Sequence, residues 1–130
     1  MTGKREIRSA KLRAPSGHFS QAIEVEAKGR IVFLSGMTAR RADGTIAGVG
    51  DIEAQTRQVC ENLKAVLEAG GSSLAKVVKV TIYMADLAEL MAMNEVFSEY
   101  FPQDPPARTT FQAAGLIAGA RVEIEAIAFV

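Results

Sequence analysis

The closing segment of the chain, residues 121–130, constrains the fold more than any other stretch of the sequence. It reads RVEIEAIAFV, so apolar residues recur at every second position, which is typical of a β-strand. The face that begins at Val122 is wholly apolar and suits packing beneath helices. The opposite face is mixed, because Ile127 and Phe129 follow two glutamates. A lone chain would expose these two side chains, so we expect a second subunit to cover that face.

The composition restricts the kind of protein to which this strand belongs. The 130 residues are 48% hydrophobic and 23% charged, which is enough for the core of one domain spanning residues 1–130. Fifteen basic residues balance fifteen acidic ones, whereas a nucleic-acid binder needs a basic excess, so we expect no nucleic-acid partner. No apolar run approaches the roughly 20 residues that span a bilayer, so we expect no membrane partner.

The side chains that most often bind metals or form disulfides are scarce. Cys60 is the only cysteine and His18 the only histidine, so we expect no disulfide framework, no zinc site and no cofactor. A structural role is favoured for Cys60. For His18, loop packing is favoured over direct catalysis. The chain opens with polar residues rather than an apolar signal region, so the cytoplasm is the expected compartment.

The hydrophobic period changes from two to about 3.6 twice along the chain. One helix is expected from its Asp51 cap to Gly70, and a second begins at its Asp86 cap. The short connection 28–30 indicates a hairpin between the strands on either side of it. These elements predict an α+β fold in which two helices cover one face of a mixed six-stranded sheet. Strands are expected at residues 6–9, 20–27, 31–35, 77–84, 107–113 and 121–130.

One segment suggests chemistry, because Arg108 stands just inside a strand after two prolines. A guanidinium held on a strand is preorganised for bidentate binding of a carboxylate. Glu123 lies 15 residues later on the final strand, and the two residues would share a neighbourhood if their strands paired as a hairpin. An ordinary salt bridge on a sheet face explains the same pair, and spacing alone favours that interpretation.

Several motifs follow one another in order along the chain. They are residues 17–22 (GHFSQA), 34–36 (LSG), Asn94, 106–110 (PARTT) and 122–128 (VEIEAIA). Together they resemble the Rid (reactive intermediate deaminase) family over essentially the whole chain. The resemblance implies a chorismate-mutase-like fold and a homotrimer with three clefts between subunits. It also implies hydrolysis of the imines and enamines that pyridoxal-phosphate enzymes release, giving 2-oxo acids and ammonia.

The same resemblance assigns roles to individual residues. Arg108 matches the arginine that anchors the substrate carboxylate, and Glu123 matches the glutamate that positions water. The family often carries a tyrosine at position 19 and a cysteine at position 110, and its loop before Arg108 is longer. The residues expected to bind substrate are Phe19, Ser35, Asn94 and Thr110.

A narrower resemblance concerns residues 35–46, 54–57 and 108–110, which are similar to 2-aminomuconate deaminases of the same superfamily. A dicarboxylate substrate of that kind requires a second cation, which Arg40 or Arg41 would supply, although both also suit a solvated charged loop. Two further functions stay open. One is non-catalytic binding of small carboxylates, and the other is ribonuclease activity, which the balanced charge disfavours.

Overall fold

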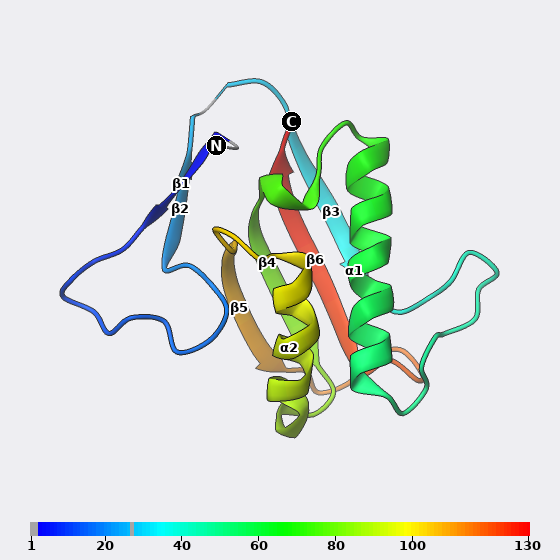
Figure 1. Cartoon of the computed structure of the whole chain (residues 1–130). Coiled ribbons are helices and arrows are strands. Elements are labelled where there is room, and N and C mark those ends of the chain that lie inside the picture. The colour runs from blue at the N-terminus through cyan, green and yellow to red at the C-terminus, as the bar shows by residue number, and fades with distance from the viewer. Residues whose placement is uncertain (1–2, 27) are drawn as a thin grey trace.

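The computed structural model describes residues 3–26 and 28–130, and it contains every helix and strand that the sequence predicts (Figure 1). Ala27, the expected last residue of the second strand, lies outside the described residues. The strand Val77–Met84 has the expected bounds, the first strand is shifted by two residues toward the N-terminus, and the other strands differ from the expected bounds by one or two residues at one or both ends. The elements are β1 (Lys4–Ile7), β2 (Ala22–Val25), β3 (Ile31–Met37), α1 (Ile52–Ala69), β4 (Val77–Met84), α2 (Leu90–Tyr100), β5 (Ala107–Gln112) and β6 (Val122–Phe129), with short 3₁₀ turns at Leu74–Lys76 and Leu87–Glu89.

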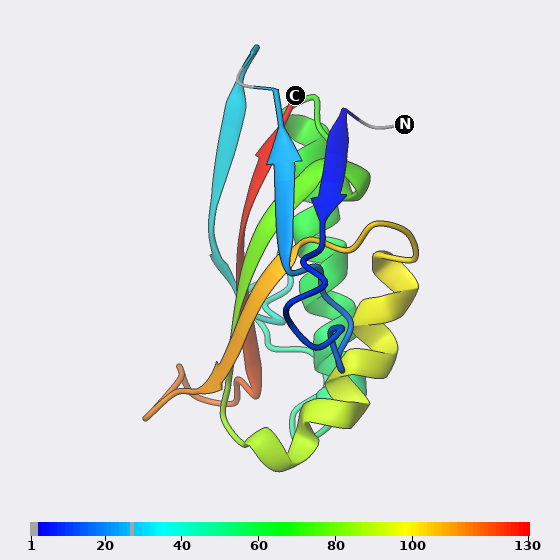
Figure 2. The same cartoon turned by 90° about the vertical axis from the view of Figure 1, so that its left-hand side faces the viewer.

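The main sheet has four strands in the order β3-β6-β4-β5. β5 runs parallel to β4, because α2 provides the crossover that a parallel connection needs, and the other pairs are antiparallel. Both helices pack on one face of this sheet, and no helix of the described residues covers the other face (Figure 2). The predicted α+β fold with two helices on one face of a mixed sheet is therefore confirmed.

The six strands do not form one continuous sheet, which corrects the expected arrangement. β1 and β2 pair with each other in a separate antiparallel sheet, and β2 lies against β4. The predicted hairpin between β2 and β3 is wrong, because β3 pairs instead with β6, the last strand. That pairing sets Leu34 opposite Ala126 on the helix side of the sheet, where both are buried. Burial against the helices thus decides the pairing over the proximity of the two strands in sequence.

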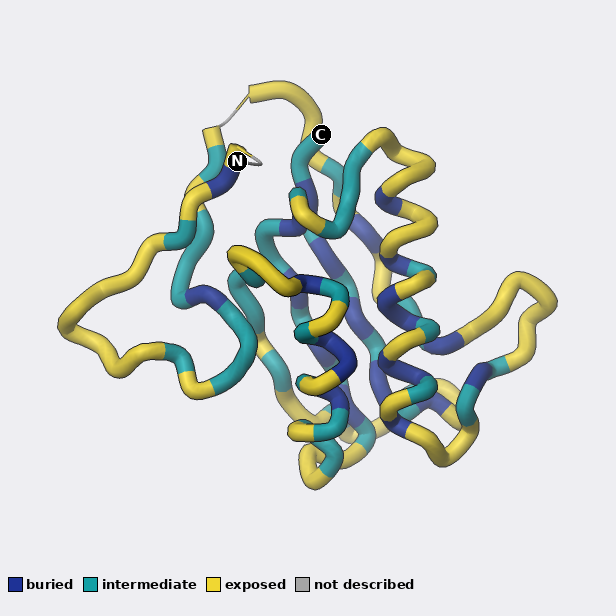
Figure 3. The backbone as a smooth tube through the Cα atoms, in the orientation of Figure 1, coloured by how far each residue is buried: buried dark blue, intermediate teal, exposed yellow. Residues whose placement is uncertain are grey.

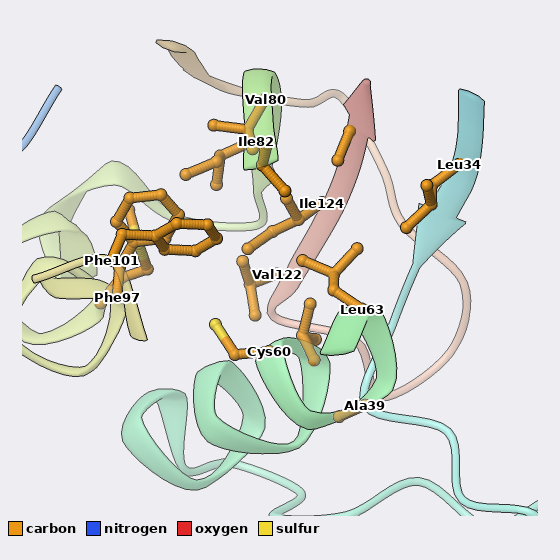
Figure 4. Close-up of a cluster of buried hydrophobic side chains, with 14 of the residues drawn as sticks. Leu34, Ala39, Cys60, Leu63, Val80, Ile82, Phe97, Phe101, Val122 and Ile124 are labelled. Atoms are coloured by element: carbon orange, nitrogen blue, oxygen red, sulfur yellow. The ribbon is translucent and has the colours of Figure 1, made fainter. Parts of the chain in front are cut away.

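The core lies between the helices and the sheet (Figure 3). Alternate residues of β6 are buried as the sequence predicts, and they meet Leu63 of α1 and Phe97 of α2 (Figure 4). On the opposite face Ile127 and Phe129 are half-buried, and Phe33 of β3 is 73% exposed. A mixed sheet face, in which these three apolar side chains stand beside polar ones such as Glu123 and Glu125, therefore remains open in the single chain.

The predicted caps of both helices are found. Asp51 accepts a hydrogen bond from the backbone nitrogen of Ala54, and α1 ends at Gly70. Asp86 accepts from the backbone nitrogen of Ala88, so it caps a 3₁₀ turn that continues directly into α2. No helix in the described part of the chain is both long enough and apolar enough to cross a membrane.

Candidate active site

Arg108 points toward the helix side of the sheet, because its partner in the β4–β5 register is the buried Val80. Its Nη1 atom donates a 2.7 Å hydrogen bond to Oδ1 of Asn94 on α2. The guanidinium carbon lies 5.7 Å from the ring centre of Phe19 and 5.3 Å from that of Phe97. The structure thus brings together three residues that the sequence singled out, namely Arg108, Asn94 and Phe19.

The charge of Arg108 is not balanced by an ion pair. Burial lowers the pKa of its guanidinium, although an arginine keeps its proton throughout the physiological range. None of the salt bridges within residues 3–26 and 28–130 involves this side chain. A half-buried cation with unused N–H donors is suited to binding an anion such as a carboxylate.

The loop that carries Phe19 is fastened to the segment that precedes Arg108. The backbone nitrogen of Ser20 donates to the carbonyl oxygen of Pro106 at 3.2 Å, and the Ser20 hydroxyl donates to that of Pro105. Ser20 also forms an isolated parallel bridge with Ala107, the first residue of β5. The prolines cannot donate backbone hydrogen bonds, but their carbonyl groups provide the acceptors that hold this loop.

Thr110 faces the same side of the sheet as Arg108, since it lies two residues further along β5 and pairs with the buried Ile82. Its Oγ1 atom is buried, and it finds no hydrogen-bond partner within the described part of the chain. Thr110 and Arg108 therefore share one face of β5, and the buried hydroxyl is a polar group that the described residues leave unsatisfied.

Glu123 and Ser35 lie on the other face of the sheet. Glu123 alternates with the buried Val122 and Ile124, so it projects away from the helices. Beside it, the register of β3 shifts between Leu34 and Met37, where Ser35 is exposed. A Cβ atom added at Gly36 would lie 2.9 Å from Cδ of Glu123, so a larger residue there would displace this carboxylate from its present position.

The hairpin pairing that would bring Arg108 and Glu123 together within one chain does not occur. Their strands do not pair, because β4 lies between β5 and β6. Arg108 pairs with residue 80 of β4 and Glu123 with residue 83, an odd number of positions apart. Odd spacing on a strand places two side chains on opposite faces. The salt-bridge interpretation fails for the same reason, and the predicted site residues form two separate groups.

Glu123 borders a surface groove of about 580 Å³ that Arg40 and Arg41 also line. Asn62 of α1 donates to the backbone oxygen of Arg40 at 2.8 Å and so fastens the loop that carries both arginines. The Arg40 side chain donates to the carbonyl oxygen of Gly44, and the Arg41 side chain donates to the hydroxyl of Thr45. Two cations and one carboxylate therefore share this groove.

Sequence reasoning missed Phe97, whose helical spacing gave it only a core role. Phe97 is fully buried and also forms one wall beside Arg108. No pattern in the sequence distinguishes it from the other apolar residues of α2. The described residues contain no cluster of three or more histidine, cysteine, aspartate or glutamate side chains arranged to hold a metal ion.

Comparison with known proteins gives a consistent result. The model of the family described as Endoribonuclease L-PSP matches residues 10–130. A RutC family protein of Pyrococcus abyssi is 42% identical over 126 residues, which cover 97% of each chain. The 2-iminobutanoate/2-iminopropanoate deaminase of Capra hircus is 38% identical over 126 residues, covering 96% of this chain and 89% of that protein. The crystal structure of YyfB, of the conserved Rid protein family of Yersinia pestis, matches with a TM-score of 0.89 and 33% identity, covering 98% of this chain and 99% of that one.

Proposed function

The chain belongs to the Endoribonuclease L-PSP family, with relatives that bear the names Rid and RutC, and from this premise we propose that it is an imine deaminase. It hydrolyses reactive 2-imino or enamino acids to 2-oxo acids and ammonia. The observation that carries the proposal is the half-buried guanidinium of Arg108, which packs near two aromatic rings and pairs with no carboxylate of the described chain. Relatives named 2-iminobutanoate/2-iminopropanoate deaminase support the substrate class.

In the proposed reaction Arg108 binds the substrate carboxylate. Asn94 occupies one donor of the guanidinium, at Nη1, and the remaining N–H groups are available for a bidentate contact. This contact fixes the neighbouring C=N carbon in position for attack. Thr110 lies on the same face of β5 and would line this part of the site, whereas Phe19 contributes an aromatic wall without the hydroxyl that a tyrosine would add.

Glu123 acts on water in this proposal. Its carboxylate orients a water molecule and accepts a proton as the oxygen adds to the imine carbon. The resulting carbinolamine loses ammonia and leaves the 2-oxo acid, so one water is consumed for each ammonia released. A protonated imine carbon is already electrophilic, and the protein contributes chiefly orientation and proton transfer. Ser35 lies on the strand beside Glu123 and would line this half of the site.

The two halves of the site belong to different subunits in this proposal. Arg108 and Glu123 face opposite sides of one sheet, so a single chain cannot direct both at the same substrate. A second copy placed against the open sheet face would bring its own Arg108 to Glu123 and cover Phe33. In a homotrimer with three such clefts, each subunit contributes Arg108 to one cleft and Glu123 to the next. The ring is closed, so no subunit keeps an unpaired interface.

Hydrolysis of 2-iminopropanoate, generated by an amino-acid oxidase and trapped by semicarbazide, tests the proposal. We expect the wild type to accelerate loss of the imine. Arg108→Ala removes the charge-assisted contacts and should lower kcat/KM by roughly a hundredfold. Arg108→Lys keeps the positive charge but loses the bidentate geometry of the guanidinium, so its kcat/KM should fall between those of the wild type and Arg108→Ala. Full activity in a folded Arg108→Ala variant would contradict the proposal. Saturable binding of 2-oxobutanoate without turnover would favour a non-catalytic carboxylate binder.

A second candidate function is deamination of a dicarboxylate such as 2-aminomuconate. The observation in its favour is that Arg40 and Arg41 line the same groove as Glu123. A distal carboxylate in this groove would meet a cation while the reacting carbon stays near Glu123. Replacing Arg41 by Gln should then reduce the rate on 2-aminomuconate and spare the rate on 2-iminopropanoate. Equal effects on the two substrates would count against this candidate.

A further inference from the structure

The guanidinium of Arg108 contacts two aromatic side chains, Phe19 at 5.7 Å and Phe97 at 5.3 Å from the ring centres, which we term the aromatic clamp. The two sides of the clamp differ in how they are held. Phe97 is fully buried in α2 and stacks on Phe101, with ring centres 4.5 Å apart (Figure 4). Phe19 lies in a loop outside the helices and strands, so its position depends on contacts made by its neighbours.

His18 is the neighbour that joins the two sides. Its Nε2 atom lies 2.6 Å from the carbonyl oxygen of Phe101, which can only accept, so this nitrogen carries the proton and donates. Its ring meets the Phe97 ring edge to face, with centres 6.3 Å apart and an angle of 75°. His18 therefore forms a hydrogen bond with the end of α2 and packs against Phe97. It also immediately precedes Phe19 in the chain, so it links the two aromatic residues of the clamp.

The end of α2 has a physical need for this hydrogen bond. The last carbonyl groups of a helix lack partners within the helix, and the Phe101 carbonyl immediately follows the final turn. The loop in turn needs a fixed position, because its backbone passes close to the guanidinium. A Cβ atom added at Gly17 would lie 3.4 Å from Nη2 of Arg108. A shift of the loop away from α2 would therefore loosen the packing around Arg108.

We propose that His18 is a positioning residue for substrate binding. By fastening the Phe19 loop to the end of α2, it holds the aromatic clamp closed and keeps the guanidinium of Arg108 oriented for a carboxylate. This inference rests on the proposed function of Arg108 as the carboxylate anchor. Within the described chain His18 contacts Phe101 and Phe97, which lie on the side of Arg108 and away from the face that carries Glu123, so its effect is expected on binding rather than on the chemical step.

The test measures carboxylate binding and turnover separately. Calorimetry with 2-oxobutanoate gives the Kd of an unreactive carboxylate, and 2-iminopropanoate hydrolysis gives KM and kcat. His18→Leu keeps a side chain of similar size but loses the N–H group that donates to the Phe101 carbonyl. The loop then packs less tightly around Arg108, and the guanidinium must be ordered when the carboxylate binds. We expect Kd and KM to rise about tenfold, with kcat changed less than about twofold.

A matched pair of amide variants controls for a loss of folding. His18→Gln retains an N–H donor that reaches the Phe101 carbonyl, whereas His18→Asn carries the same group on a chain shorter by one methylene. We expect His18→Gln to restore binding close to the wild-type value and His18→Asn to behave like His18→Leu. If His18→Leu does not fold, the difference in Kd between His18→Gln and His18→Asn is sufficient to test the inference.

Three results would overturn the inference. The first is an unchanged Kd in both His18→Leu and His18→Asn. The second is a fall in kcat as large as the fall in kcat/KM in the His18 variants, which would show that His18 acts in the chemical step. The third is a wild type that does not bind 2-oxobutanoate, which would also remove Arg108 as the anchor. A wild type that binds 2-oxobutanoate but hydrolyses no imine would refute the proposed function and leave the role of His18 measurable by calorimetry.

Discussion

Mixing two inactive variants should restore activity if each cleft takes Arg108 from one subunit and Glu123 from its neighbour. Within one chain these residues lie on opposite faces of the sheet, with β4 between their strands. Two strand spacings separate their backbones by about 10 Å before the side chains diverge. The variants to combine are Arg108→Ala, which loses the carboxylate anchor, and Glu123→Gln, which keeps the shape of the glutamate but loses the proton acceptor.

The expected recovery follows from the symmetry of a trimer. In any ring that contains both variants, only one of the three clefts combines an intact Arg108 with an intact Glu123, so a purified mixed trimer should show about one third of wild-type activity. An equal, random mixture contains about three quarters mixed rings, so its activity should reach about one quarter of the wild type. Either variant alone should show roughly a hundredfold less than the wild type.

The assay co-expresses the two variants with different affinity tags and isolates mixed trimers by two successive purifications. Release of ammonia from 2-iminopropanoate is then measured at equal protein concentration. The control combines Arg108→Ala with the double variant Arg108→Ala/Glu123→Gln, which contains no intact arginine and should stay inactive. Mixed trimers, confirmed by mass, that remain as inactive as their parents would refute the two-subunit cleft.

Two further predictions concern Gly36 and Cys60. A Gly36→Ala variant should displace the Glu123 carboxylate, because the new Cβ would lie 2.9 Å from Cδ of Glu123. We expect kcat to fall about a hundredfold and the Kd for 2-oxobutanoate to stay unchanged. An unchanged kcat would contradict the placement of Glu123. Burial raises the pKa of the Cys60 thiol from 9.0 to about 12, so the folded protein keeps a proton that the unfolded chain loses above about pH 9. The stability that this difference provides is complete below about pH 8, and about 2 kcal/mol of it should be lost between about pH 8 and 10.5. Urea unfolding should show a smaller loss of stability for Cys60→Ala over this range, and equal losses would show that the thiol is not the cause.

The sequence alone determined the local structure. The alternating residues of the last strand, the Asp51 cap and the stop at Gly70 each act through neighbours within one turn or one strand. Patterns of this kind follow from the periods of helix and strand, so they are visible before any tertiary contact forms. The sequence also pointed to Arg108, because a resemblance between short motifs is carried by the residues themselves.

Only the tertiary structure decided which elements meet. The parallel pairing of β4 with β5, and the departure of β3 from β2 toward β6, depend on how apolar faces are buried against the helices. The same choice of partners places Arg108 and Glu123 on opposite faces and brings His18 to the end of α2, across 83 positions of chain. Such contacts join residues distant in sequence, and their free energy comes from packing that the whole fold creates, which no local pattern encodes.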